Sequence, residues 1–274
     1  MKTIIKILVT FFPLFGAFAQ TEIPVGTWRT HYSYEQMHRV LQTSTKIFAA
    51  SSQGLLSFDP EDKSLTKLNK LNVLNDATIS AMAYDANKDR LLLGYETGNM
   101  DLITADGVFN IPKLLNSGTT ENKRINHINF HQDNAYLSTD FGLLVVDLLE
   151  LGISDAFQNL GEAGEIISIH QSSIWNDEIY LASSTGILKG ELSSAINLQD
   201  FNNWHHFKDS VVLNKNMSSI IAIGDVIYAA SDLQVYKGDG LSWDSLDFVP
   251  DFAEVVLGLK PGINGLLVIT SLGV

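Results

Sequence analysis

The chain has 274 residues, of which 45% are hydrophobic and 18% are charged. Acidic residues outnumber basic ones by 31 to 18, which gives a net charge of −13. This balance argues against nucleic acid or an anionic membrane surface as the main partner, because both attract clustered lysine and arginine. The length suffices for one large domain with a proper core. The absence of cysteine excludes disulfide bonds, a lipid-modified cysteine, thiolate metal sites and a cysteine nucleophile.

Residues 1–19 have the pattern of a secretory signal peptide. Lys2 and Lys6 provide the basic start, residues 7–15 form an apolar stretch, and Ala17-Phe18-Ala19 supplies the small residues of a cleavage site. We therefore expect an exported protein in the periplasm or at the outer-membrane cell surface, with a mature domain of residues 20–274. No later segment approaches the ~18 consecutive apolar residues of a spanning helix, so the sequence predicts no transmembrane segment.

A repeat dominates the rest of the chain. One glycine marks each copy, and successive copies are 44 residues apart: Gly54, Gly98, Gly142 and Gly186. An apolar or aromatic residue precedes each glycine at the same distance: Phe48, Leu92, Tyr136 and Tyr180. A period of about 40–50 residues with short β segments is typical of propellers and solenoids.

Each repeat is predicted to contain an apolar strand, a polar turn, a second strand that ends near the glycine, and a third strand after it. In chain order the predicted strands are 79–84, 90–96 and 99–104, then 125–130, 135–139 and 143–148, then 166–170, 178–183 and 187–192, and finally 220–223, 226–231 and 234–238. Runs such as Leu91-Leu92-Leu93 are apolar on both faces, as expected for a sheet packed between two others. The predicted fold is therefore an all-β propeller of four-stranded antiparallel blades.

Tryptophans mark a further strand of the repeat. Trp28 and Trp204 are separated by four repeats, and Trp243 resembles a third copy. We expect these residues to open the outer strand of a blade, where the large ring covers the rim of the neighbouring sheet. A platform on which carbohydrate stacks is the alternative, and it makes Trp28 and Trp204 candidate contacts for a glycan or a partner.

The end of the sequence falls inside a repeat. Residues 265–274 match the second strand and turn of a sixth copy. We expect a propeller of roughly six or seven blades, with seven preferred, that is incomplete at its C-terminus. An unpaired strand edge is a liability in a mature protein, which favours a fragment of a longer polypeptide.

One segment imitates a calcium loop. Residues 85–89 and Glu96 place oxygen ligands at suitable intervals, but Arg90 occupies the position where glycine makes the sharp bend. Aspartate and asparagine in a hairpin turn explain the segment more simply, and residues 90–95 have the pattern of a strand. We therefore predict no metal site here and no cofactor.

The remaining polar residues suggest no catalytic centre. No nucleophile elbow, phosphate-binding loop or dinucleotide fingerprint is present, and the histidines do not form a helical pair suited to zinc. The histidines are His31, His38, His127, His131, His170, His205 and His206. The densest basic cluster is Lys63, Lys67 and Lys70. We interpret it as a solvated strand edge, with a contact for an anion or a partner as the alternative.

The opening of the mature chain resembles a known family. Residues 23–34, which contain Trp28-Arg29-Thr30-His31-Tyr32, and the first repeat over residues 46–55 are similar to the N-terminal propeller of PorZ-like proteins of the type IX secretion system. The resemblance covers residues 23–274. Its most specific part is the Trp-Arg-Thr-His-Tyr opening, since many bacterial periplasmic propellers share the repeat.

The resemblance implies the first part of a protein with roughly two propellers and a C-terminal sorting domain. It implies a non-enzymatic role in a cell-surface attachment complex, where the family supports a sortase and binds or delivers anionic lipopolysaccharide. No catalytic residue is carried over. The acidic balance of the chain agrees poorly with an anionic glycolipid, unless the contact lies elsewhere or uses bound cations.

Two other functions stay open at this point. A periplasmic sensor propeller of a two-component receptor would be followed by a transmembrane helix and a kinase. A propeller enzyme acting on polysaccharide would show activity on glycans that one carboxylate substitution abolishes.

Overall fold

The computed structural model describes residues 32–246, 255–263 and 265–271. The chain divides into a unit of residues 1–32 and a compact unit of residues 33–274, and every element below belongs to the second unit. The predicted signal peptide and Trp28 lie outside the described residues. No helix in the described part of the chain is long and apolar enough to span a membrane.

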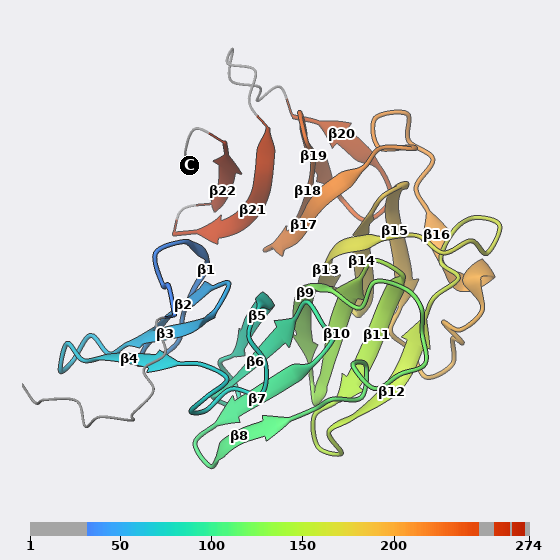
Figure 1. Cartoon of the computed structure of the whole chain (residues 1–274). Helices are drawn as coiled ribbons and strands as arrows, with labels where there is room; N and C mark the ends of the chain where they lie inside the picture. The colour runs from blue at the N-terminus through green and yellow to red at the C-terminus, as the bar shows by residue number, and fades with distance from the viewer. Residues whose placement is uncertain (1–31, 247–254, 264, 272–274) are drawn as a thin grey trace, which may run out of the picture. The chain divides into compact units, whose positions relative to one another are not determined.

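Six antiparallel sheets follow one another along the described residues, five with four strands and the last with two (Figure 1). The first contains β1 (Met37–Gln42), β2 (Ile47–Ser51), β3 (Gly54–Phe58) and β4 (Leu65–Leu68). The second contains β5 (Ile79–Asp85), β6 (Arg90–Tyr95), β7 (Met100–Thr104) and β8 (Gly107–Asn110). The third contains β9 (Ile125–His131), β10 (Asn134–Thr139), β11 (Gly142–Asp147) and β12 (Gly152–Phe157).

The remaining sheets repeat this order. The fourth contains β13 (Ile169–Trp175), β14 (Glu178–Ser183), β15 (Gly186–Glu191) and, after a short 3-10 helix (Phe201–Asn203), β16 (His205–His206). The fifth contains β17 (Met217–Ile223), β18 (Val226–Ser231), β19 (Val235–Gly238) and β20 (Trp243–Ser245). The sixth pairs β21 (Val256–Gly262) with β22 (Gly265–Thr270).

Within each sheet the strands lie side by side in chain order, so the first strand forms one edge and the last strand the other. The first strands of consecutive sheets contact each other, from β1 to β5 and onward to β21. Figure 1 shows these strands gathered at the centre, with the later strands of each sheet pointing outward. This is the arrangement of blades in a propeller.

The hydrophobic core lies between the sheets. Leu92 packs into the cluster shared with the third sheet, whereas Leu91 and Leu93 pack into the cluster shared with the first. Successive side chains of a strand point to opposite faces, so a sheet between two neighbours needs apolar residues at every position. The two-sided apolar runs in the sequence are thus confirmed as strands buried on both faces.

Three of the four repeated glycines begin the third strand of a sheet, and Gly98 lies two residues before β7. Gly142 has φ of 129°, and a Cβ atom there would lie 2.1 Å from the main-chain oxygen of Phe157, the last residue of the outermost strand. Gly54 has the same relationship to the oxygen of Leu68, at 2.5 Å. At these two positions the end of the fourth strand passes directly over the turn, so a side chain has no room.

Two predicted first strands are wrong in their bounds: residues 220–223 cover only the end of β17, and the prediction for the fourth sheet is displaced. The sequence suggested residues 166–170 for the first strand of the fourth sheet, whereas β13 covers Ile169–Trp175. Ile167 belongs to the preceding loop and is buried against the core between the third and fourth sheets. The apolar pattern missed β13 because its middle, His170-Gln171-Ser172-Ser173, is polar. His170 and Ser173 bond to main-chain groups of the neighbouring strand β17, and Gln171 bonds the Ser219 side chain there.

Candidate functional site

The three lysines predicted as a contact lie along the edge strand β4. Lys63 is in the turn before the strand, Lys67 is within it and Lys70 follows it, and all three are exposed. Lys67 Nζ lies 5.3 Å from the ring centroid of Tyr34, and Lys70 Nζ lies 3.4 Å from a carboxylate oxygen of Asp76. The lysines therefore occupy a solvated strand edge and do not converge on one point.

The described tryptophans of the repeat sit where outer strands begin. Trp243 opens β20 and Trp204 immediately precedes β16, and both strands are the outermost of their sheets. Only 4% of Trp204 is exposed. Its ring packs edge-to-face with the ring of Phe157, and the two ring centroids are 5.9 Å apart. The indole N–H of Trp204 donates to the main-chain oxygen of Leu198 at 2.9 Å. This packing leaves no free face of the Trp204 ring on which a sugar could stack.

The segment that imitates a calcium loop is a hairpin between β5 and β6. Asp85 and Arg90 face each other in the ladder, and Arg90 Nε donates to the Asp85 carboxylate at 2.9 Å. Glu96 is engaged elsewhere, with Arg124 at 3.4 Å. Asp85 and Glu96 are thus paired with arginine, Asp89 accepts a hydrogen bond from the Tyr84 hydroxyl at 2.7 Å, and residues 90–95 form the predicted strand.

Polar side chains at the second position of the first strands join neighbouring sheets. His38 Nε2 bonds the main-chain oxygen of Ile79, and His170 Nδ1 bonds that of Met217, both at 2.8 Å. Asn126 uses its amide in the same way. His38, Asn126 and His170 are spaced at multiples of the 44-residue repeat, a signal that could have revealed this role from the sequence.

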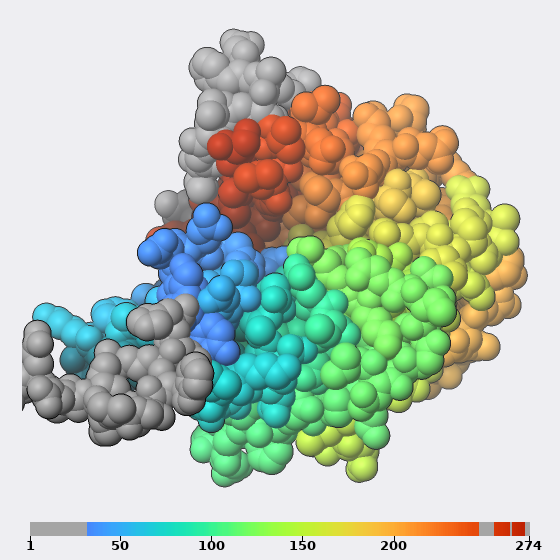
Figure 2. Space-filling view, in the orientation of Figure 1, coloured from blue at the N-terminus to red at the C-terminus, as the bar shows by residue number. Residues whose placement is uncertain are grey.

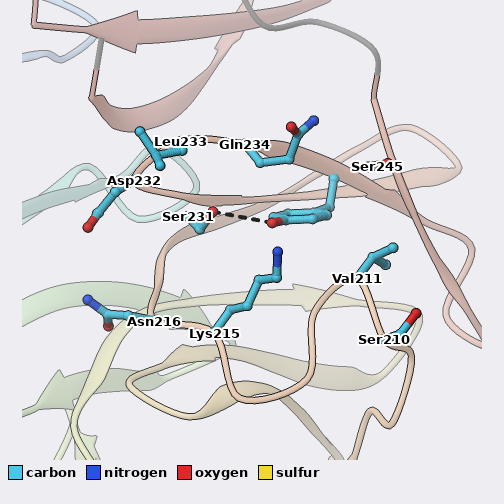
Figure 3. A pocket seen from close by; sticks show the side chains of 10 residues that line it. Ser210, Val211, Lys215, Asn216, Ser231, Asp232, Leu233, Gln234 and Ser245 are labelled. Atoms are coloured by element: carbon cyan, nitrogen blue, oxygen red, sulfur yellow. Dashed lines mark hydrogen bonds between the residues drawn. The ribbon is translucent and has the colours of Figure 1, made fainter. Parts of the chain in front are cut away.

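A hollow lies on the surface between the loop before β17 and the outer strands of the fifth sheet (Figure 3). Its volume is about 620 Å³, and Ser210, Lys215, Ser231 and Gln234 are among its lining residues. Lys215 Nζ lies 5.5 Å from the ring centroid of Tyr236. The Lys215 ammonium therefore makes a cation–π contact with one of the residues that line the hollow.

The central channel contains a cavity with a volume of about 650 Å³. The first strands of all six sheets line it. One lining residue from each, in chain order, is Arg39, Met82, His127, Gln171, Ser218 and Lys260. An adjoining hollow of about 230 Å³ shares His127, Gln171 and Lys260. No local sequence pattern brings these residues together, because they come from separate repeats.

Sheets arranged in chain order around a channel lined by their first strands define the chain as a β-propeller domain. A family model described as the N-terminal β-propeller domain of PorZ, from the type IX secretion system, matches residues 47–205. This match covers more than half of the chain, and the chain therefore belongs to that family. The matched residues run from β2 to β16, so the repeats carry the match and the opening over residues 23–34 lies outside it. A comparison with curated proteins finds no match.

Solved structures show the same fold. PorZ of Porphyromonas gingivalis, described as an essential bacterial surface component of the type IX secretion system, matches with a TM-score of 0.73 and 20% identity, over 90% of this chain and 37% of that one. The extracellular domain of a putative hybrid two-component system from B. thetaiotaomicron matches with a TM-score of 0.64 and 15% identity, over 87% of this chain and 32% of that one. At such identities the likeness shows the fold alone. The chain spans about a third of the length of these structures.

Proposed function

We propose that the chain is a non-enzymatic propeller module of the type IX secretion system, within a cell-surface attachment complex. In this role it supports a sortase and binds or delivers anionic lipopolysaccharide. The observation that carries the proposal is the membership of the chain in the PorZ N-terminal propeller family. The signal pattern of residues 1–19 supports export to the periplasm or the outer-membrane surface.

Charge restricts how such a domain would hold an anionic glycolipid. With a net charge of −13, most of the protein repels a polyanion. Binding therefore requires a local cationic site or bound cations. The exposed lysines of β4 are candidates for a weak contact of this kind. Lys63 has no described carboxylate partner and is free to meet an anion, whereas Lys70 is already paired with Asp76.

Deletion of the gene tests the proposed role in secretion. Cargo proteins of the type IX system are expected to keep their C-terminal sorting domains in the deletion strain, and the wild-type gene supplied in trans should restore cleavage. The measurement is the mass of the secreted cargo. Normal cargo processing in the deletion strain would contradict the role.

A second experiment tests the lipopolysaccharide. The full-length gene product is expected to bind purified anionic lipopolysaccharide and not lipopolysaccharide that lacks the anionic polysaccharide. Defective cargo processing combined with equal binding of both preparations would retain sortase support and remove delivery. A transmembrane helix and kinase encoded in the same gene would instead support the sensor function.

A further inference from the structure

Positively charged side chains meet in the central channel from opposite ends of the described chain. Arg39 lies on β1 and Lys260 on β21, and both line the cavity of about 650 Å³. Figures 1 and 2 show the first sheet, in blue, beside the last, in red. Among the described residues no aspartate or glutamate lines this cavity or the adjoining hollow, although acids outnumber bases by 31 to 18 in the chain.

Neither cation has a partner of opposite charge. In the described part of the chain, bases such as Arg90 and Lys189 form ion pairs, whereas Arg39 and Lys260 form none. Arg39 Nε is buried without a hydrogen-bond partner. Buried donors are normally satisfied, because a donor that leaves water without a replacement destabilises the fold. Arg39 therefore lies beside the cavity with an unsatisfied donor and with no carboxylate to neutralise its charge.

The positive charges in the channel repel one another. Burial in the first place, and then the charge of Arg39, lowers the pKa of Lys260. Burial, and then Arg124, lowers the pKa of Arg39 in the same way. Burial is also the main reason why the pKa of His127 falls to about 3, so this ring is neutral near pH 7. An anion between the two cations would replace their repulsion with attraction.

Neutral donors lie beside the cations. Gln171 Oε1 accepts a hydrogen bond from Ser219 Oγ at 2.6 Å, which leaves the NH₂ group of Gln171 as a donor at the channel. His127 Nδ1 accepts from the main-chain N–H of Ser172 at 3.5 Å, so the neutral ring carries its proton on Nε2. Bonds to the neighbouring strand orient both side chains before any ligand arrives.

We propose that the central channel binds a small oxyanion, namely a carboxylate or phosphate group, between Arg39 and Lys260. The guanidinium presents paired N–H donors that match the oxygens of either group, and the ammonium adds a point charge. The cavity has room for a sugar-sized molecule that carries the anion. Because the two cations come from the first and the last described sheets, the anion also joins these sheets. The site rests on the charges of the channel and is independent of the proposed role in secretion.

Calorimetric titration of the full-length protein with inorganic phosphate, glucuronate and glucose tests this site. Phosphate and glucuronate are expected to bind, whereas glucose, which lacks the anionic group, is not. Arg39→Gln and Lys260→Gln should each weaken binding by at least about tenfold, the effect of losing one charged contact. Lys237→Gln is the matched control, because it removes one exposed positive charge from β19, away from the residues that line the channel, and it should leave the affinity unchanged.

Thermal unfolding provides a second readout. The anions should raise the Tm of the wild type and of Lys237→Gln and leave that of Arg39→Gln unchanged. If Arg39→Gln does not fold, Lys260→Gln replaces it, because Lys260 is the more exposed of the two side chains. Failure of both anions to bind the wild type, equal binding of glucose and glucuronate, or an equal loss in Lys237→Gln would each overturn the proposal.

Discussion

The imidazole Nδ1 of His170 donates to the main-chain oxygen of Met217 at 2.8 Å, and so joins the first strands of the fourth and fifth sheets. The same joint occurs one sheet earlier, where Asn126 Nδ2 donates to the oxygen of Ile169 at 3.0 Å. Consecutive sheets are not paired by a backbone ladder, so these side chains supply the polar link at the channel. The link fixes the spacing of the sheets where the channel is formed.

The His170 joint is expected to contribute measurably to stability. His170→Ala should lower the free energy of unfolding by about 1–3 kcal/mol, because the Met217 oxygen loses its partner. His170→Asn should recover most of the loss, since Asn126 makes the equivalent bond with an amide. Urea unfolding of the two variants measures the difference. Equal destabilisation by both would show that the ring is needed for its packing and not for this bond.

The repeated glycine should tolerate no side chain. Gly142→Ala places a Cβ atom 2.1 Å from the Phe157 oxygen at a φ of 129°, so both backbone strain and a clash arise. Gly107→Ala is the control, because its φ is 138° and no atom lies within 4 Å of the added Cβ. Strain alone costs about 1–3 kcal/mol, and Gly142→Ala should exceed this. Similar unfolding free energies for the two variants would contradict the explanation given for the glycine repeat.

Asp85 and Arg90 form a buried ion pair, with each side chain only 6% exposed. Asp85→Ala should destabilise the fold by roughly 3 kcal/mol, because it leaves the buried guanidinium without its closest carboxylate. Joint replacement by Asp85→Leu and Arg90→Met should cost much less, since no charge is then left uncompensated. Calcium should not change the Tm of the wild type. A calcium-dependent rise in Tm that Asp85→Ala abolishes would restore the metal site that the sequence imitates.

His127 should make stability depend on pH below neutrality. Its pKa is about 3 in the folded protein, chiefly through burial and then through Lys260 and Arg39, against 6.5 for an ordinary histidine. The unfolded chain takes up a proton as the pH falls through 6.5 while the folded chain does not. The contribution is therefore complete above pH ~6.5 and is lost towards pH 3, by up to ~1.4 kcal/mol per pH unit.

Chemical unfolding between pH 7 and pH 4.5 measures this slope. His127→Gln should reduce it, because glutamine does not titrate. The pKa of His206 is also lowered, mainly by burial, so part of the slope should remain until His206→Gln is added. An unchanged slope in His127→Gln would show that the ring is protonated in the folded state.

The architecture was largely predictable because each blade is a local structure. Leu92 and Tyr136 lie in second strands as predicted, and the third strands begin at or near the repeated glycines. The bounds of β13 were predicted incorrectly because apolar periodicity detects only those strand faces that are buried in the hydrophobic core. His170 and Gln171 of β13 are polar and bond to the neighbouring strand β17, so a search for apolar residues passes over them.

The candidate site was harder to predict than the fold. A tryptophan ring such as that of Trp204 is suited to stacking on a sugar, yet its position at the rim of a blade buries the ring. The lysines of β4 were the visible basic cluster because they are close in sequence. Arg39 and Lys260 are far apart in the sequence, so no local pattern links them, although they line one cavity.

The sequence by itself determined that this is an all-β propeller, because the 44-residue spacing records a turn that every blade must make. It also determined the acidic charge that disfavours polyanionic partners over most of the surface. Only the tertiary structure decided which side chains meet at the centre. Burial and charge at that point depend on six first strands brought together from the whole chain, and no local pattern encodes their convergence.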